Sequence, residues 1–280
     1  MQQAQSLGCD CLQIFSKSPR SWNAPPLDAE KCASFRTAWK DSGFSPLVVH
    51  DSYLINLAAP DETARRKSVA AMIDEVERAD ALGADFLVTH CGAHLQKENE
   101  DSGANLFCDG EFSPGVAAGL ATLVQSLREV LDKTPNANVK IALENTAGQG
   151  TCLGGPFEHL AFVLNEIKGD RLRVCFDTCH AHAAGHAIES TPLFGRTLQR
   201  FDEIIGLDKL AIIHFNDSKG EAGKHLDRHE HIGQGNIGRE AMRGILCHPQ
   251  LQHLPFILET PDVETMIEAN LNAVRELREK

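Results

Sequence analysis

The sequence predicts an α/β protein whose parallel strands close into a TIM (β/α)8-type barrel, and three observations support this. Short apolar runs alternate with amphipathic helical segments along the chain. The runs are continuously apolar, which is typical of strands buried on both faces of a parallel sheet. Six runs end on His, Asp or Glu, and closure into a barrel would bring six strand ends around one centre.

Seven apolar runs are predicted to be strands. The first, CLQIF at 11–15, leads into the polar loop SKSPRSW. The other six stop at residues of metal-binding types, namely His50, His90, Glu144, Asp177, His214 and Glu259. A complete barrel needs eight strands, and the chain opens with what looks like the end of a helix, AQSLG. We therefore expect the barrel to lack its first strand.

The helical segments between these runs carry recognisable start and stop signals. Asp61 is a good N-cap and Gly83 a good stop for the segment between them, and Ser113-Pro114 opens another helix. Helices are predicted over 61–82, 113–133, 157–168, 192–206, 238–247 and 262–278. The stretches 92–112 and 218–238 are expected to form long loops on the functional face. Because the composition does not shift along the chain, residues 1–280 are expected to form one domain.

The composition limits the possible settings and partners. Hydrophobic residues make up 42% and charged residues 24%, with no apolar stretch of bilayer length and no secretory signal, so we expect a cytoplasmic protein without a membrane partner. Nine cysteines without CxxC pairs favour reduced thiols. The net charge of −12 argues against broad attraction to nucleic acid, unless bound divalent cations offset part of it.

Two local clusters add to the residues at the strand ends. In DTCH, Asp177 and His180 are expected to point to the same side of a loop, and in DRHEH, Asp227 and His229 alternate in an extended segment. The candidate metal ligands are therefore His50, His90, Glu144, Asp177, His180, His214, Asp227, His229 and Glu259. Mixed nitrogen and oxygen ligands suit zinc or manganese, and nine are enough for two or three ions. Taken singly, a histidine such as His50 is more often a hydrogen-bonded structural residue.

The motifs closely resemble those of the endonuclease IV family of apurinic/apyrimidinic (AP) endonucleases. They are HDSYLINLA (50–58), ALENTAGQGT (142–151), FDTCHAHAAGH (176–186), HFNDSK (214–219), DRHEHIGQGNIG (227–238) and PFILET (255–260). They follow the family's order along nearly the whole chain. The sequence departs from the family at Cys91, where proline is usual, and in lacking a counterpart of the first strand and its loop.

The resemblance implies a TIM barrel that holds three zinc ions at the carboxyl ends of its strands. One ion would be held by His50, His90 and Glu144. Glu144 would bridge to a second ion bound by Asp177, His214 and Glu259. The third ion would be held by His180, Asp227 and His229. Manganese could replace zinc at some positions.

The resemblance also implies a reaction and a partner. The substrate would be double-stranded DNA containing an abasic site, cleaved 5′ to the lesion to give a 3′-hydroxyl and a 5′-deoxyribose phosphate. Glu144 and Glu259 would be the catalytic carboxylates, because Glu144 sets the separation of two ions and Glu259 orients the attacking group. Arg20 and the only tyrosine, Tyr53, are the expected DNA contacts, and Trp22 either joins them or packs at the barrel edge. We expect a monomer.

Two other interpretations of the sequence remain open. A xylose-isomerase-like sugar isomerase or epimerase also places Glu, Asp and His at strand ends around a divalent cation, but it needs about four ligands and leaves DTCH and DRHEH unexplained. A metal-dependent protein that binds damaged DNA without cleaving it is the second. The number of bound ions separates the first alternative from the nuclease.

Overall fold

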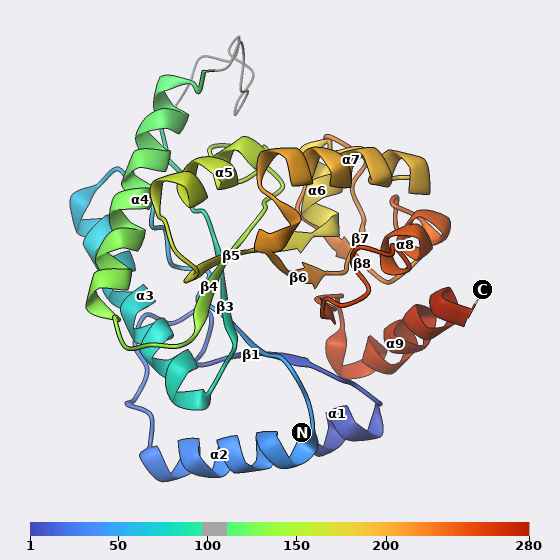
Figure 1. Ribbon diagram of the computed structural model, residues 1–280, viewed down its shortest axis with the longest axis horizontal. Helices are drawn as coiled ribbons and strands as arrows, with labels where there is room; N and C mark the ends of the chain where they lie inside the picture. Colours follow the sequence, from blue (N-terminus) through green and yellow to red (C-terminus); the bar gives the residue numbers. More distant parts are fainter. Residues whose placement is uncertain (97–110, 280) are drawn as a thin grey trace.

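The computed structural model describes residues 1–96 and 111–279, and its main feature is one parallel sheet of seven strands (Figure 1). The order in the sheet is β1-β2-β3-β4-β5-β6-β9, which is the order along the chain. These strands are β1 (Leu12–Phe15), β2 (Leu47–His50), β3 (Phe86–His90), β4 (Lys140–Glu144), β5 (Leu172–Asp177), β6 (Leu210–His214) and β9 (Phe256–Ile257). All seven predicted strands are therefore confirmed. Strands β7 (Asp217–Ser218) and β8 (His229–Glu230) form a separate antiparallel pair.

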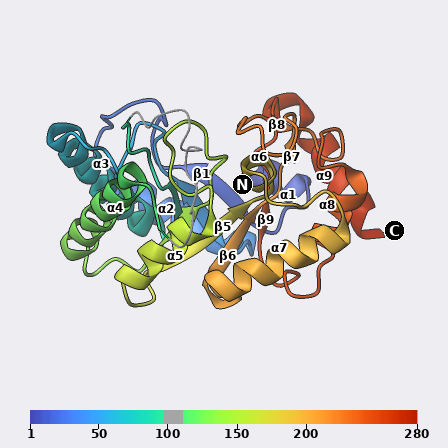
Figure 2. The same ribbon diagram turned by 90° about the horizontal axis from the view of Figure 1, so that it is seen from above.

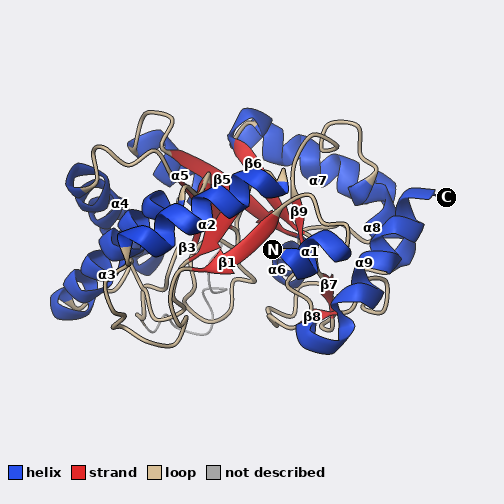
Figure 3. Cartoon of the chain, turned by 90° about the horizontal axis from the view of Figure 1, so that it is seen from below, coloured by secondary structure: helices blue, strands red, loops and turns tan. Residues whose placement is uncertain are grey.

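Helices surround the strands, as Figures 2 and 3 show from opposite sides. They are α1 (Gln2–Ser6), α2 (Ala29–Ser42), α3 (Glu62–Leu82), α4 (Pro114–Lys133), α5 (Phe157–Glu166), α6 (Thr178–Ala184), α7 (Thr191–Ile204), α8 (Arg239–Leu246) and α9 (Val263–Glu279), with a short 3-10 helix at Leu207–Lys209. The six predicted helices are confirmed to within two residues at their ends. Helix α2 was not predicted, because its sequence is mostly polar and Cys32 is its one buried residue.

The helix ends follow the predicted capping chemistry. The Asp61 carboxylate accepts a hydrogen bond from the Ala64 N–H at 2.8 Å, and Ser113 caps α4 in the same way. Gly83 ends α3 with φ of 77°, a left-handed conformation that glycine adopts without strain. The chain can therefore turn sharply from α3 towards β3.

The placement of DTCH in a loop is wrong. Thr178–Ala184 form α6, and the Asp177 side chain caps it by accepting a hydrogen bond from the His180 N–H at 2.7 Å. The segment 218–238, predicted as a loop, contains β8 and one residue of β7. Of the other predicted loop, residues 97–110 lie outside the described part of the chain.

Apolar side chains pack on both faces of the sheet. Between the strands and the outer helices lies the larger core, with residues such as Leu47, Leu87 and Leu120 fully buried. The barrel interior holds a second cluster contributed by six strands, namely Val48, Val88, Ala142, Cys175, Ala211, Ile212 and Ile257. This burial on both faces explains why the strands read as continuous apolar runs.

Within the described residues the sheet has seven strands rather than eight, as predicted, so β1 and β9 are its edges. The two edges are linked at their carboxyl ends, where the Gln13 amide of β1 donates to Glu259 Oε1, just after β9, at 2.6 Å. Before β1 in the chain, the Leu7 carbonyl at the end of α1 accepts a hydrogen bond from the Arg275 guanidinium of α9. These contacts bring the first and last elements of the chain together.

Candidate metal centre

Side chains from six strand ends converge at the carboxyl end of the barrel. The parallel register places His90 beside Glu144 and Asp177 beside His214. Among the described residues, possible metal-ligating atoms within 4.8 Å of one another form five groups, and three of these together contain all nine predicted ligands. The first group is His50, His90 and Glu144. The second group is Glu144, Asp177, His214 and Glu259. The third group is His180, Asp227 and His229.

Glu144 belongs to the first two groups and presents a different oxygen to each. Its Oε2 lies 3.4 Å from His50 Nε2 and 3.2 Å from His90 Nε2. Its Oε1 lies 3.0 Å from His214 Nδ1, which is also 3.2 Å from Glu259 Oε2. A carboxylate with one oxygen directed to each group has the geometry of a bridging ligand.

The third group forms around α6 and β8. His180 Nε2 lies 3.3 Å from Asp227 Oδ1, and His229 Nε2 lies 3.6 Å from the same oxygen. His180 Nδ1 also lies 3.2 Å from Glu144 Oε1. The third group therefore adjoins the other two, and the three form one continuous cluster.

The donor atoms fit divalent cations. Glu144 Oε2 and His229 Nε2 are buried and have no hydrogen-bond partner among the described residues, although nitrogens or oxygens face both of them. Buried polar atoms without a partner are costly, and a cation would satisfy both. Imidazole nitrogens combined with carboxylate oxygens suit zinc or manganese.

The electrostatics keep Glu144 and Asp227 ionised. Burial tends to raise the pKa of Glu144, but the neighbouring His214 and His90 outweigh it and hold that pKa well below its usual range. Burial likewise opposes the charged form of Asp227, yet contact with His180 lowers its pKa to about 2. For His50, burial opposes protonation, but contact with Glu144 and nearby carboxylates raises its pKa to about 9. A cation at the site would compete with protons on such an imidazole.

Three cysteines adjoin the ligands but are poorly suited to join them. Cys175 and Cys179 each lie close enough to complete an alternative group of donors. Burial is the main cause that raises the pKa of Cys91, Cys175 and Cys179 to about 12, so all three are neutral thiols at neutral pH. Cys175 packs in the barrel interior, as predicted.

The two predicted DNA contacts lie on adjoining loops at the same end of the barrel. Tyr53 is 59% exposed, and its ring centroid is 5.7 Å from that of Phe15 and 5.8 Å from that of His50. The Tyr53 N–H donates to the Pro19 carbonyl at 3.1 Å, which fixes its loop against the loop that carries the exposed Arg20. Trp22 is half-buried, with Lys67 Nζ 4.1 Å from the centroid of its ring system.

A buried ion pair anchors the loop of Arg20 to helix α3. Lys17 Nζ lies 2.7 Å from Asp74 and 3.5 Å from Glu75, with only 2% of the Lys17 side chain exposed. The Ser16 hydroxyl donates to Glu75 at 2.6 Å. The loop 16–22 is therefore attached at its start.

Comparison with known proteins agrees with this geometry. A family model described as "Xylose isomerase-like TIM barrel" matches residues 1–278. The chain is 42% identical over 269 residues to a "Probable endonuclease 4" of Chloroflexus aggregans, which covers 96% of this chain and 88% of that protein. A relative with the same description in Methanosphaerula palustris is 41% identical over 279 residues, covering 99% and 92%. The chain belongs to the endonuclease IV family.

Solved structures place this family member in the same fold. The crystal structure of endonuclease IV from Thermus thermophilus matches with a TM-score of 0.81 and 34% identity, covering 99% of this chain and 92% of that one. A D-tagatose 3-epimerase-like protein matches with a TM-score of 0.70 and 20% identity, covering 100% and 92%. The second match shows the barrel fold alone.

Two asparagines of this endonuclease IV family member position the cluster, and the sequence did not assign them that role. The Asn145 amide donates to the Asp177 carbonyl at 3.1 Å and accepts from the Asp177 N–H at 2.7 Å. Asn216 donates to the Asp177 carboxylate and accepts from the Glu259 N–H. The available signal was their position, directly after Glu144 and two residues after His214.

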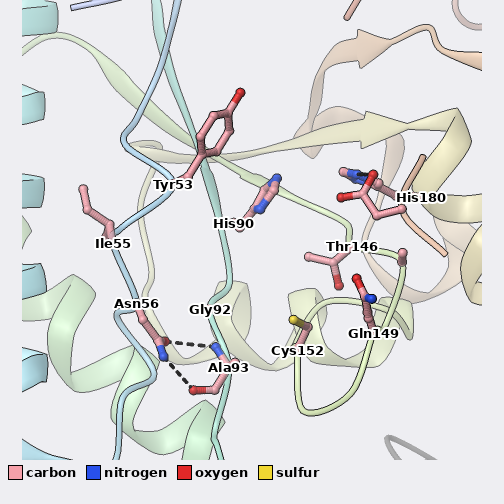
Figure 4. Close-up of a pocket in the computed structure, with 12 residues that line it drawn as sticks. Tyr53, Ile55, Asn56, His90, Gly92, Ala93, Thr146, Gln149, Cys152 and His180 are labelled. Carbon is pink, nitrogen blue, oxygen red and sulfur yellow. Dashed lines mark hydrogen bonds and ion pairs between the residues drawn. The ribbon is translucent and has the colours of Figure 1, made fainter. Parts of the chain in front are cut away.

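A pocket of about 230 Å³ opens beside the third group (Figure 4). Its lining includes His90, His180 and Asp227 from the cluster, together with Tyr53. The far wall is held by Asn56, whose amide donates to the Ala93 carbonyl and accepts from the Ala93 N–H, both at 2.9 Å. The pocket therefore connects the candidate metal ligands with the exposed aromatic side chain.

In the described ranges 1–96 and 111–279, every helix is too short or too polar to cross a membrane. The eight cysteines of those ranges are free thiols.

Proposed function

We propose that this chain is a zinc-dependent AP endonuclease that hydrolyses the phosphodiester 5′ to an abasic site in double-stranded DNA. The products would be a 3′-hydroxyl and a 5′-deoxyribose phosphate. The observation that carries the proposal is that nine candidate metal ligands form three adjoining groups, two of which share Glu144, in a member of the endonuclease IV family. Three zinc ions would occupy the groups, with manganese possible at some positions.

Zinc supplies Lewis acidity for activating water near neutral pH and for neutralising the charge that develops on a phosphodiester. Glu144 is assigned a catalytic role because its two oxygens fix the spacing between the first two groups. Glu259 is assigned the orientation of the attacking water. Burial opposes its ionisation, but His214 outweighs burial and keeps the pKa of Glu259 below its usual range, so its carboxylate is an acceptor at neutral pH.

Recognition of the lesion is assigned to the exposed side chains beside the cluster. An abasic site leaves a gap in the base stack that a protein side chain can enter. Tyr53, exposed and backed by Phe15, is suited to stack there, and Arg20 on the adjoining loop is suited to contact phosphate or base edges. Three bound dications would offset part of the net charge of −12, and they would do so at the face that meets DNA.

A sugar isomerase or epimerase on the same barrel is less well supported. The epimerase-like structures share the fold at 20% identity or less, whereas the endonuclease relatives reach 43%. A mononuclear site would also leave His180, Asp227 and His229 without a role. We further propose that the chain acts as a single-domain monomer in the cytoplasm, which light scattering of the purified protein and cell fractionation would test.

The decisive experiment is incubation of zinc-loaded protein with a labelled duplex that contains a tetrahydrofuran abasic analogue. We expect incision immediately 5′ to the analogue, loss of incision after treatment with a strong chelator, and recovery on adding zinc back. An undamaged duplex of the same sequence is the control. Metal analysis should give about three ions per chain. Absence of chelator-sensitive incision by folded, metal-loaded protein would refute the nuclease, and one ion per chain would favour the isomerase.

A further inference from the structure

Strand β1 is the one strand of the described seven-stranded sheet that is not followed closely by a candidate ligand, yet it reaches the cluster through Gln13. The Gln13 Oε1 atom lies 2.8 Å from His214 Nε2, and its Nε2 atom lies 2.6 Å from Glu259 Oε1. These partners are 201 and 246 residues away in sequence. One amide therefore contacts two of the candidate ligands of the second group.

The orientation of that amide follows from its partners. The Gln13 NH2 group donates to Glu259 Oε1, a carboxylate oxygen that accepts the hydrogen bond. The Gln13 carbonyl oxygen then faces His214 Nε2. Since a carbonyl oxygen only accepts, His214 must carry a proton on Nε2, and the lone pair of the neutral ring must lie on Nδ1.

This arrangement is the reverse of that of three other candidate histidines. In His50, His180 and His229, Nδ1 contacts a backbone carbonyl, at 3.0, 2.9 and 2.8 Å, and Nε2 faces the cluster. In His214, Nδ1 faces Glu144 and Glu259, and Nε2 points away from them to a side chain. A histidine that ligates a metal through one nitrogen is usually held by a hydrogen bond from the other, which fixes its tautomer and ring orientation.

We propose that Gln13 is a positioning residue of the metal centre. It holds His214 with Nδ1 free to ligate, and it binds Glu259 Oε1 so that Oε2 is directed at the second group. The inference rests on the proposed function of this site. Strand β1, at the edge of the sheet, would then help to position the ligands of the second group. Gln13 would do so without being a ligand itself.

Gln13→Met tests the inference, because methionine has a similar length and shape but neither hydrogen-bonding group. We expect zinc affinity at the second group to fall on the order of 10- to 100-fold in competition with a chromophoric chelator. One ion per chain should be lost more readily on dialysis. Incision should show a lower kcat with a nearly unchanged KM for the abasic duplex. Gln252→Met, at an exposed glutamine remote from the cluster, is the matched control and should behave like the wild type.

A purely structural role for Gln13, linking the two edge strands, makes a different prediction. It would lower the unfolding temperature of the metal-free protein while leaving zinc affinity per folded molecule unchanged, and that result would overturn the proposal. Gln13→Glu is the second variant should the methionine variant not fold. It keeps an acceptor for His214 but repels Glu259, so zinc affinity at the second group should fall below that of the wild type while the Nε2–H of His214 is retained.

The tautomer can be observed directly. In ring 1H–15N spectra of the zinc-loaded protein, His214 should show a slowly exchanging Nε2–H that exchanges faster in Gln13→Met. A wild-type protein that binds three ions without incising DNA would refute the proposed function, while the affinity series would still decide the role of Gln13. Unchanged affinity in an active, zinc-loaded variant would refute this inference alone.

Discussion

The Asn216 amide donates to Asp177 Oδ2 at 2.6 Å, and both side chains are fully buried. The carbonyl oxygen of the same amide accepts from the Glu259 N–H at 2.7 Å. Asn216 therefore joins the ends of β5 and β9, although β6 lies between them in the sheet. Two candidate ligands of the second group are thereby held at a fixed separation.

Replacing Asn216 by alanine should weaken the second group without removing a ligand. We expect zinc affinity to fall on the order of 10- to 100-fold, as for other residues that support metal ligands. Stability should fall by roughly 1–3 kcal/mol, because a buried N–H is left without its acceptor. Metal titration and denaturant unfolding check the two effects. Wild-type zinc affinity in Asn216→Ala would contradict the positioning role.

Removal of the Glu144 side chain should affect two groups at once. In Glu144→Ala we expect incision to be abolished and the zinc content to fall by more than one ion per chain, because each carboxylate oxygen faces a different group. Metal content by mass spectrometry and incision of the abasic duplex are measured on the same sample. Asp227→Ala is the comparison, since it should disturb mainly the third group. Full activity of Glu144→Ala would rule out the bridging role.

Arg20→Ala should weaken DNA binding rather than metal binding. If Arg20 contacts a phosphate, the variant should bind the abasic duplex less tightly, and the slope of log affinity against log salt should fall by about one. Zinc content should be unchanged. Arg66→Ala, at an exposed arginine of α3 paired with Glu62, is the matched control. Equal affinities of the two variants across the salt series would remove Arg20 from the DNA surface.

Acid should destabilise the fold through the buried His159. Burial, with a smaller effect of His94, lowers the pKa of His159 to about 4. The unfolded chain binds this proton near pH ~6.5. Stability from this group is therefore complete above about 6.5 and declines as the pH falls towards 4, by about 3 kcal/mol in total.

The measurement is the free energy of unfolding of wild type and His159→Gln between pH 7 and 4, both in chelator. In the wild type the Gly154 N–H donates a hydrogen bond to His159 Nδ1 at 3.1 Å, and glutamine retains an acceptor for it. The difference between the two proteins should shrink as the pH falls. Parallel curves would show that His159 does not titrate in this range.

Local sequence patterns were enough to predict much of the fold. The apolar runs identified all seven strands, because burial on both faces leaves no alternating polar residues. Caps such as Asp61 and Gly83 located helix ends to within two residues. Helix α2 was missed because it buries little, and α6 was missed because Asp177 looked like the end of a strand and also caps a helix.

Part of the candidate site could also be predicted from the sequence. The nine candidate ligands were identified in this way, because parallel strands bring their carboxyl ends to one edge whatever their separation along the chain. The contacts of Gln13, Asn145 and Asn216 could not be predicted, because the sequence does not show whether a side-chain amide contacts solvent or a metal ligand. Their role depends on distances and orientations between strands.

The sequence by itself determined the barrel, the inventory of donors and the resemblance to endonuclease IV, because each depends on residue type and on periodicity along one strand or helix. Only the tertiary structure decided how the donors are grouped and which nitrogen of His214 faces the cluster. Those properties arise where side chains from β1, β4, β6 and the segment after β9 meet. Hydrogen bonds and electrostatics act over a few ångströms in space, and spacing along the chain does not record that distance.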